Sequence, residues 1–340
     1  MKKLNIAIVG AGWYGCHLAL SLLQAGHEVT LFEATDSTIS GASRKNQNRL
    51  HLGFHYPRNY PTREQSRDGF EWFQEHYSHL VETIDNNLYA IASQSSYIDF
   101  PTYLQILTAS ELPFSVQQQA PVALQNIEGL IRVGEKLVRN DLASRYFNRV
   151  LAAVLQLNTR IDLADPAVYA QMTADYDYVL DCSWGTARKI SGFETFYEPC
   201  IYFYYRCLLA EPFALTIMDG QFFSLYPYVD DIFTLTSVAH TPIGRADSMA
   251  AVAALFASAQ QADFVAAKRA AFEREVAHFY PDFLQHFSFH ACEYSLKTKV
   301  VSGSDFRGCL VTQSDNYISV FSGKIDTLHI AEMKVFEIIT

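Results

Sequence analysis

A glycine-rich turn between two apolar segments is the feature that most constrains the fold of this chain. Residues 4–9 form a short apolar run, which predicts a buried parallel strand. A GxGxxG motif at residues 10–15 follows at once and opens a segment with helical periodicity. A second apolar run over 29–32 ends at Glu33. Strand, glycine turn, helix, strand and acid occur in the order that predicts a Rossmann-like βαβ unit.

Each part of this unit has a mechanical role in binding a dinucleotide. Gly10 permits the tight turn, Gly12 lets the backbone approach a pyrophosphate, and Gly15 lets helix and strand pack closely. The phosphates then meet the positive end of the helix dipole. Glu33 is suited to accept hydrogen bonds from ribose hydroxyls, which disfavours a 2′-phosphorylated nicotinamide. FAD or NAD remains, and a turn without a ligand is the weaker alternative.

Composition excludes several other classes of function. The 340 residues suit about two domains. With 36 acidic against 26 basic side chains the formal net charge is -10, which argues against nucleic-acid and anionic-membrane partners. No apolar run is long enough for a membrane span or a signal peptide. Six separated cysteines without a CxxC pair indicate neither a zinc site nor disulfides, so we expect a protein of the reducing cytoplasm.

The segment after the second strand points to one of the two dinucleotides. Residues 40–58 are polar and glycine-punctuated, as expected of a loop that wraps a ligand. Gly41-Ala42-Ser43 and Leu50-His51-x-Gly53-x-x-Tyr56 resemble the flavin-contacting loop of the D-amino-acid-oxidase-like (DAO) FAD-dependent oxidoreductases. The resemblance implies that FAD is the cofactor.

Two later segments resemble the same family. Residues 175–185 match the strand that returns to the dinucleotide fold and ends in a glycine beside the cofactor. Residues 316–326 match a strand and turn before a final helix to about residue 338, which in the family places backbone N–H groups at the flavin pyrimidine. This chain has only Gly323 where relatives carry more glycines, with Lys324 beside it. Lys324 either supplies the same positive charge or is a solvated residue at the helix start.

The resemblance implies a glutathione-reductase-type α/β fold. A discontinuous Rossmann-like FAD-binding domain is expected over 1–85, 123–192 and 301–340. A second, α+β substrate domain with a mixed or antiparallel sheet is expected over 86–122 and 193–300. The residues expected at the cofactor are Gly10, Gly12, Trp13, Tyr14, Gly15, Glu33, Ala34, Ala42, Ser43, Asn48, Arg49, Leu50, His51, Ser183, Trp184, Gly185, Ser322, Gly323 and Lys324.

Local patterns predict the remaining elements. Thr62-x-x-Gln65 reads as a capping box that opens a helix. Residues 202–206 predict a strand, and 222–226 with 232–237 predict a hairpin. Residues 248–279 predict a helix.

The expected catalytic residues are His51, Tyr204, Arg206, Tyr226 and Lys324. Tyr204 and Arg206 share one face of their strand by period-two alternation and could hold a substrate carboxylate, or the face could be solvated and packed. Tyr226 is a similar case. His51 could contact the flavin ring, tether it covalently or act as a base.

The function that these features predict is an FAD-dependent oxidase or dehydrogenase. It would remove a hydride from the carbon bearing an amine or hydroxyl group of a small, carboxylate-containing substrate, because the flavin carries the redox step. Two alternatives stay open. One is a non-redox flavoenzyme of the sugar-nucleotide mutase type, and the other is a binding protein with a degenerate cofactor site.

Overall fold

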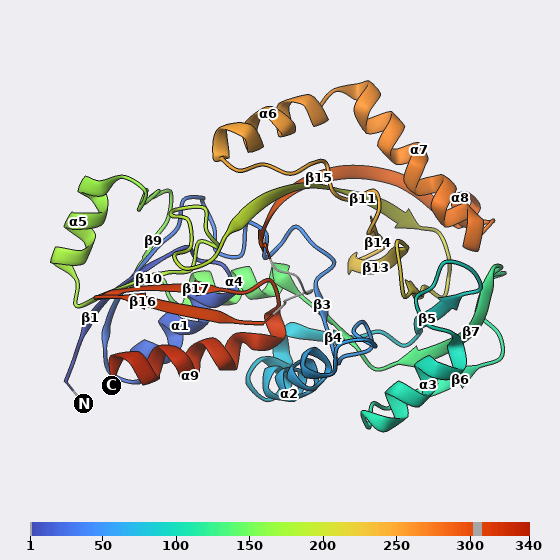
Figure 1. The fold of residues 1–340 in the computed structure, drawn as a ribbon, viewed down its shortest axis with the longest axis horizontal. Coiled ribbons are helices and arrows are strands. Elements are labelled where there is room, and N and C mark those ends of the chain that lie inside the picture. The colour runs from blue at the N-terminus through green and yellow to red at the C-terminus, as the bar shows by residue number, and fades with distance from the viewer. Residues whose placement is uncertain (1, 302–307) are drawn as a thin grey trace. The chain divides into compact units, whose positions relative to one another are not determined.

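The computed structural model describes residues 2–301 and 308–340 and divides the chain into two compact units. Unit 1 comprises Met1–Arg44, Asn140–Tyr197 and Lys297–Thr340. Unit 2 comprises Lys45–Arg139 and Glu198–Leu296. Figure 1 draws the order of their elements along the chain.

Unit 1 is built on a six-stranded sheet with the order β16-β17-β10-β1-β2-β9. All neighbours are parallel except β16 and β17, which are antiparallel. The predicted βαβ unit is confirmed, with α1 between β1 and β2. The strands are β1 (Asn5–Val9), β2 (Glu28–Phe32), β9 (Leu155–Gln156), β10 (Tyr178–Asp181), β16 (Leu310–Ser314) and β17 (Tyr317–Phe321).

Alternating side chains of β1 bury both faces of this sheet, as a central parallel strand requires. Ala7 and Val9 join an apolar cluster with Met172 of α5 (Pro166–Asp175). On the opposite face, Ile8 approaches Gly15 of α1 (Trp13–Gln24). The terminal helix α9 (Leu328–Ile339) contacts α1 and β16, and Figure 1 shows it in red beside them. The remaining helices of unit 1 are α4 (Asn140–Val150) and η2 (Ile325–Thr327).

Unit 2 contains the larger sheet, whose order is β15-β11-β14-β13-β12-β5-β7-β6, and a small sheet of order β3-β8-β4. The predicted hairpin is confirmed as the antiparallel pair β13 and β14. The strands of both sheets are β3 (Arg49–Leu50), β4 (Val81–Thr83), β5 (Asn87–Ala92), β6 (Phe114–Gln117), β7 (Ile127–Val133), β8 (Lys136–Val138), β11 (Thr195–Cys207), β12 (Ala214–Met218), β13 (Phe223–Val229), β14 (Ile232–Ser237) and β15 (Phe287–Val300).

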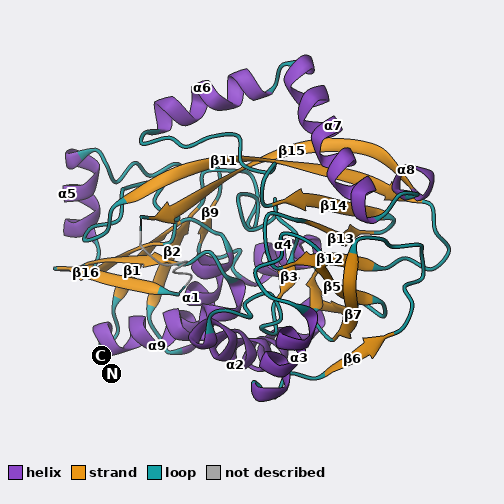
Figure 2. Cartoon of the chain, turned by 45° about the vertical axis from the view of Figure 1, so that its right-hand side comes forward, coloured by secondary structure: helices purple, strands orange, loops and turns teal. Residues whose placement is uncertain are grey.

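The two faces of the large sheet differ in chemistry. On one face, Phe203 and Phe233 pack with Phe272 and Val276 of α7 (Ala262–Phe279), so this helix covers the apolar core (Figure 2). The other face carries tyrosine, threonine and serine side chains. Such alternation is what a sheet with one core-facing side produces.

The helices of unit 2 correct two sequence predictions. The helix expected from Thr62 is α2 (Tyr60–Tyr77), and its cap is Asn59, whose side chain accepts the Thr62 N–H. The amide of Asn59 therefore does what the capping box was expected to do. The single helix predicted over 248–279 is two helices, α6 (Met249–Ala259) and α7. The other helices of unit 2 are η1 (Ser78–Leu80), α3 (Phe100–Ala109) and α8 (Phe283–His286).

Among the described residues no single helix is both long and apolar enough to cross a membrane. The pair α6 and α7 meets the length and composition requirements only when the two are taken together, and they are bent by 82°.

The compact units differ from the predicted domain boundaries. Residues 45–85 and 123–139 were expected in the FAD-binding domain, but the structure groups them in unit 2. The reason is strand pairing, because β3 and β4 both pair with β8, and β7 pairs with β5. Part of the predicted segment 301–340, residues 302–307, lies outside the described residues.

The close approach at Gly15 predicts a measurable cost for a single methyl group. A Cβ at Gly15 would lie 1.9 Å from the backbone oxygen of Gly10, so Gly15→Ala must displace the turn. We expect a loss of about 2 kcal/mol in the free energy of unfolding, measured by urea denaturation. Gly41→Ala is the matched control, since its Cβ would meet no atom within 4 Å, and it should change stability by less than about 1 kcal/mol. Equal effects of the two variants would contradict the packing argument.

Candidate functional site

The glycine turn of unit 1 leaves the start of α1 open. Gly10 has φ +98°, and its N–H donates to the Phe32 carbonyl at 2.8 Å, which closes the turn onto β2. A Cβ at Gly10 would lie 3.0 Å from the carbonyl oxygen of Cys182, so the turn also abuts the end of β10. Gly12 is the N-cap of α1 and provides no side-chain cap. The backbone N–H groups of the first helical turn therefore suit an anionic ligand.

Glu33 is held against this turn. Its Oε2 accepts the N–H of Ala11 at 2.8 Å. Its Oε1 accepts the N–H and hydroxyl of Thr35 at 3.0 and 2.9 Å. Ala34 stands between these two residues in sequence. A carboxylate oriented in this way has lone pairs left to accept hydroxyl groups of a ribose.

Ser43 joins the start of α1 to a residue that the sequence analysis missed. The Trp13 N–H donates to Ser43 Oγ at 3.3 Å. Asn140 accepts the Trp13 indole N–H at 2.7 Å and donates to the Ser43 carbonyl at 2.7 Å. Asn140 begins α4, almost a hundred residues away in sequence, and no motif marks it. Only the fold brings its amide to Trp13 and Ser43.

The segment 183–185 is fixed by a buried carboxylate. Asp181 accepts the Ser183 N–H and the Tyr317 hydroxyl, both at 2.9 Å. Burial raises the pKa of Asp181, although these two donors oppose the shift. Trp184 has φ +58°, and its indole Nε1 is buried without a hydrogen-bond partner among residues 2–301 and 308–340. An unsatisfied buried donor is costly, so a ligand that accepts from it would be stabilised.

The turn of residues 322–324 is buried and tied to α1. Lys324 Nζ lies 3.0 Å from Asp326 Oδ2, with side-chain exposures of 4% and 1%. Of the two alternatives for Lys324, the solvated one is therefore wrong, and the charge of the side chain is balanced by Asp326. Tyr14 donates its hydroxyl hydrogen to the Lys324 carbonyl. Gly323 lies against Trp184, whose Cζ2 would be 3.4 Å from a Cβ at this position.

Unit 1 thus contains most of the predicted cofactor residues, namely Gly10, Gly12, Trp13, Tyr14, Gly15, Glu33, Ala34, Ala42, Ser43, Ser183, Trp184, Gly185, Ser322, Gly323 and Lys324. The helix start, whose N-cap Gly12 offers no side chain, the oriented Glu33 and the unsatisfied indole of Trp184 all fit an adenine dinucleotide.

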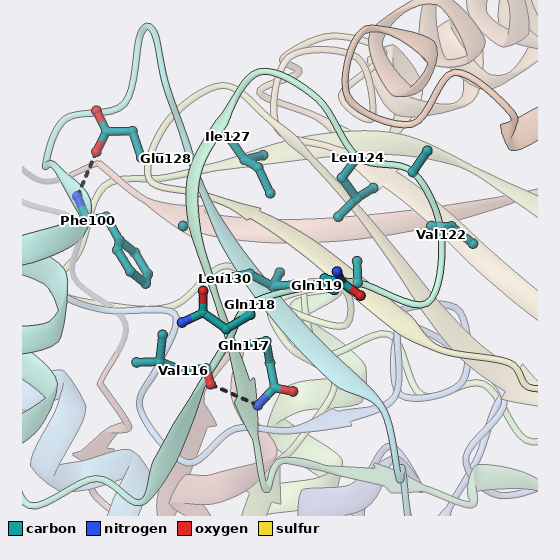
Figure 3. A pocket seen from close by; sticks show the side chains of 13 residues that line it. Phe100, Val116, Gln117, Gln118, Gln119, Val122, Leu124, Ile127, Glu128 and Leu130 are labelled. Carbon is teal, nitrogen blue, oxygen red and sulfur yellow. Dashed lines mark hydrogen bonds between the residues drawn. The ribbon is translucent and has the colours of Figure 1, made fainter.

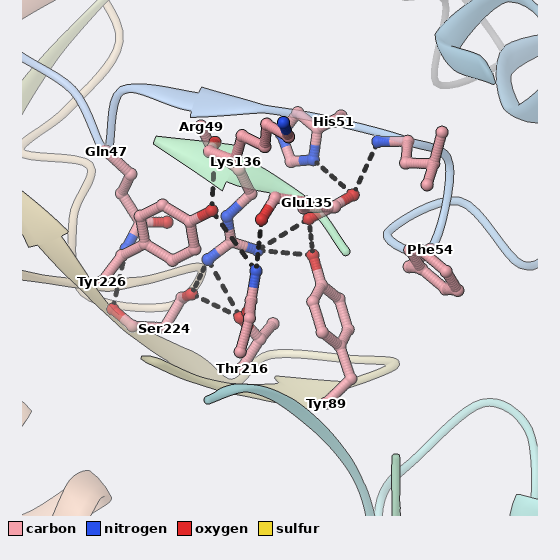
Figure 4. A network of polar contacts seen from close by, with 12 residues as sticks. Gln47, Arg49, His51, Phe54, Tyr89, Glu135, Lys136, Thr216, Ser224 and Tyr226 are labelled. Atoms are coloured by element: carbon pink, nitrogen blue, oxygen red, sulfur yellow. Dashed lines mark hydrogen bonds and ion pairs between the residues drawn. The ribbon is translucent and has the colours of Figure 1, made fainter. Parts of the chain in front are cut away.

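In unit 2 a buried arginine organises the polar face of the large sheet (Figure 4). Thr216 is in register with Tyr89 on one side and Ser224 on the other. Arg49 donates to the hydroxyls of these three residues at 3.0, 2.6 and 2.6 Å respectively. Its guanidinium also lies 4.0 Å from the ring centroid of Tyr226, a cation–π contact. Arg49 was predicted beside the flavin; here its Nη1 and Nη2 are engaged by the sheet, while its buried Nε has no hydrogen-bond partner within residues 2–301 and 308–340.

Glu135, which the sequence analysis did not single out, faces this arginine. It is buried and accepts the Leu52 N–H at 2.9 Å and the Tyr89 hydroxyl at 2.5 Å. Arg49 Nη1 lies 3.9 Å from its Oε2, and His51 Nδ1 lies 3.5 Å from its Oε1. Burial alone would raise the pKa of Glu135, but His51, Arg49 and the Tyr89 hydroxyl outweigh it and lower the pKa to about 2.

His51 stands at the edge of this cluster, with 23% of its side chain exposed. The ring centroids of His55 and Tyr56 lie 5.5 and 5.6 Å from its own. Arg63 donates to the carbonyls of Tyr56 and Pro57 and so holds the turn that carries these rings. Asn48 and Leu50, two residues of the same segment that were predicted at the cofactor, are buried.

The other predicted catalytic residues of unit 2 do not all gather. Tyr226 and Tyr204 are buried and both in register with Thr234, so they share the polar face. Tyr226 donates its hydroxyl to the Lys136 carbonyl at 3.2 Å. Arg206 is 51% exposed and paired with Asp231 at 3.5 Å, away from the cluster around Arg49.

A cavity of about 640 Å³ opens elsewhere in unit 2, between β6, β7 and the loop that joins them (Figure 3). Phe100, Gln117, Leu124 and Ile127 are among the residues that line it. None of the predicted site residues does.

The low pKa of Glu135 makes stability depend on pH. The pKa is about 2 in the folded chain against an ordinary 4.5, so its contribution is present above pH 4.5 and is lost as pH falls towards 2. At neutral pH we expect Glu135→Gln to lower the free energy of unfolding by about 3 kcal/mol. The difference in unfolding free energy between this variant and the wild type should become smaller below about pH 4.5. Urea unfolding across this pH range measures it. Glu82→Gln, in an exposed pair with Arg139, should cost less than about 1 kcal/mol, and a pH-independent cost at Glu135 would contradict the assignment.

Comparison with known proteins agrees with the cofactor site of unit 1. The family model for FAD dependent oxidoreductases, DAO, matches residues 5–115. The chain is 36% identical over 339 residues to the FAD-dependent monooxygenase FPY4 of Fusarium mangiferae, covering 98% of this chain and 91% of that protein. It is 26% identical to the FAD-dependent monooxygenase kojA of Aspergillus flavus, covering 99% and 86% of the two chains.

Solved structures show the same fold. The L-alpha-glycerophosphate oxidase of Mycoplasma pneumoniae with FAD bound superposes with a TM-score of 0.72 at 14% identity, covering 100% of this chain and 95% of that one. Glycine oxidase of Geobacillus kaustophilus gives 0.68 at 14% identity, covering 99% and 94%. The predicted α/β fold with a Rossmann-like cofactor domain is confirmed, and FAD is preferred over NAD. The chain therefore belongs to the DAO family of FAD-dependent oxidoreductases.

Proposed function

We propose that the protein removes a hydride from the carbon bearing an amine or hydroxyl group of a small, carboxylate-containing molecule in the cytoplasm. Bound FAD supplies the electron-accepting ring for this reaction. The observation that carries the proposal is His51, a partly exposed imidazole held 3.5 Å from a buried, ionised carboxylate. Oxidation of an amine or alcohol releases a proton from the heteroatom, and an imidazole in this setting is suited to accept it.

The cofactor contacts in this proposal come first from unit 1. The N–H groups at the start of α1 would meet the pyrophosphate, and Glu33 the adenosine ribose. The indole N–H of Trp184 would donate to FAD, which supplies the acceptor that this buried group lacks within residues 2–301 and 308–340. Lys324, already neutralised by Asp326, would contribute chiefly its backbone near the flavin.

The proposed substrate contacts are His51 and the tyrosines of the polar face, Tyr204 and Tyr226. His51 is also proposed to contact the flavin. Arg206 is the proposed carboxylate anchor that the geometry supports least, because binding a substrate there would require release of Asp231. Two of the similar structures are named as oxidases, of glycine and of L-alpha-glycerophosphate, which carry an amine and a hydroxyl respectively.

A second function has support from the relatives. The 36% identical protein of Fusarium mangiferae is named a monooxygenase. A monooxygenase places one oxygen atom of O₂ in its product. The two reactions share a reduced flavin but differ in the source of the electrons and in the fate of O₂, so an experiment with labelled oxygen separates them.

Glu33 should control FAD affinity. Glu33→Ala removes a charged hydrogen-bond acceptor for the ribose, and we expect FAD binding to weaken about 10- to 100-fold. The dissociation constant is measured by titration calorimetry on protein from which FAD has been removed. The control is Glu28→Ala, an exposed residue at the start of β2, the strand that Glu33 follows; Glu28 pairs with Lys3, and this variant should bind FAD as the wild type does. Unchanged affinity in Glu33→Ala would contradict the ribose assignment.

The proposed reaction predicts direct reduction of the enzyme by substrate. The purified yellow protein, kept anaerobic, is mixed with a panel of amino acids, secondary amines and 2-hydroxy acids. We expect absorbance near 450 nm to bleach with at least one of them, because hydride transfer reduces the flavin. The product formed under ¹⁸O₂ should then contain no label from O₂. Bleaching only by a reduced nicotinamide nucleotide, with one ¹⁸O atom in the product, would instead establish a monooxygenase.

A further inference from the structure

We propose that Glu135 is a positioning residue for His51, fixing the hydrogen of the imidazole on Nδ1 so that Nε2 is the atom that accepts the substrate proton. This inference rests on the proposed function, in which His51 is the base. It adds a residue that no sequence motif marks and gives a reason for the buried ion pair beneath His51.

The carboxylate of Glu135 is held too firmly to be an incidental neighbour. The Leu52 N–H binds its Oε1 at 2.9 Å, and the Tyr89 hydroxyl binds its Oε2. Arg49 adds a positive charge at 3.9 Å. Since Leu52 directly follows His51, the backbone donor that orients Glu135 belongs to the same segment as the imidazole. The imidazole ring of His51 and the carboxylate of Glu135 are therefore held in a fixed position relative to each other.

The direction of the contact decides the tautomer. An ionised carboxylate only accepts hydrogen bonds, so an imidazole nitrogen facing it is favoured in the protonated form. Nδ1 of His51 is buried and has no hydrogen-bond partner among residues 2–301 and 308–340, so Glu135 at 3.5 Å faces an unsatisfied ring nitrogen. The 23% of the side chain that is exposed therefore lies on the rest of the ring. The distance of 3.5 Å is longer than a good hydrogen bond, and such contacts commonly shorten when substrate binds.

Arg49 stabilises the negative charge of Glu135 but does not compete with His51 for a hydrogen bond to this carboxylate. Its hydrogen bonds go to Tyr89, Thr216 and Ser224, so it acts on Glu135 as a nearby charge. The other ionisable groups that face His51 are His55 and Tyr56, whose rings lie alongside. Glu135 is the only carboxylate that the described residues place within ion-pair distance of this imidazole.

The chemical step balances with these groups and FAD as the oxidant. The O–H or N–H bond of the substrate breaks, and its proton forms a bond with His51 Nε2. Bound FAD would accept the C–H hydrogen together with its electron pair, and the substrate carbon would become doubly bonded to oxygen or nitrogen. His51 then carries a positive charge beside the negative charge of Glu135, an arrangement that lowers the energy of the transition state.

A double-mutant cycle tests whether Glu135 acts through His51. The variants are Glu135→Gln, His51→Ala and both together, each loaded with FAD, and the readout is the rate constant of anaerobic flavin reduction by the fastest substrate of the panel. We expect Glu135→Gln to lower this rate constant at least about 10-fold when His51 is present and less than about 2-fold when it is absent. Equal losses in both backgrounds would show a merely structural role and overturn the proposal.

Two control variants separate positioning from damage to the fold. Tyr89→Phe removes one donor from Glu135 but leaves its charge beside His51, so it should lower the rate constant less than Glu135→Gln does. Glu82→Gln, on the surface, should leave it unchanged. Cofactor content and circular dichroism, compared across all variants, identify any that fail to fold.

Nuclear magnetic resonance tests the tautomer without any substrate. In FAD-loaded protein with ¹⁵N-labelled histidine, the signals of His51 are those missing from His51→Ala. We expect a protonated Nδ1 and an unprotonated Nε2 at neutral pH, and a mixture of tautomers in Glu135→Leu, or in Glu135→Gln if the leucine variant does not fold. A hydrogen on Nε2 in the wild type would overturn the inference. If the tautomer is as expected but His51→Ala reduces at the wild-type rate, the proposed role of His51 as base fails while the positioning by Glu135 stands.

Discussion

The interior of unit 2 depends on one ion pair, Arg49 with Glu135. A carboxylate taken out of water is stable in its charged form only if positive charge and hydrogen bonds replace the lost solvent. Arg49, the Leu52 N–H and the Tyr89 hydroxyl provide that replacement. Nη1 and Nη2 of the arginine in turn donate to hydroxyls from three strands, so the pair fixes both the sheet face and the segment that follows β3.

In unit 1 the corresponding constraint is the close packing of backbone at the glycine turn rather than a buried ion pair. Its glycine turn brings α1 so close to the end of β1 that a methyl group at Gly15 would meet the oxygen of Gly10, and Gly10 itself abuts Cys182 at the end of β10. The polar groups left over, from the helix start to the indole of Trp184, are donors that suit an anionic, oxygen-rich ligand. Family membership identifies that ligand as FAD.

The sequence predicted well what local pattern determines. The βαβ unit, the β13–β14 hairpin and the final helix follow from periodicity and turn residues close together in the chain. Asn140 and Glu135 were missed because their partners lie far away in sequence and neither stands in a motif. The Thr62 capping box failed for a local reason, since the amide of Asn59 reached the same N–H. The exposure of Arg206 shows that alternation gives the face of a strand but not whether that face is covered.

The contacts of Arg49 have a consequence for how such an enzyme can diversify. Arg49 of β3 reaches β5 through Tyr89, β12 through Thr216 and β13 through Ser224. A lysine carries one compact ammonium and cannot span three strands, so even this conservative replacement would leave hydroxyls and a carboxylate unmatched. If Tyr204 contacts the substrate as proposed, changes in substrate preference are more accessible on β11, where Tyr204 packs edge-on against Tyr228.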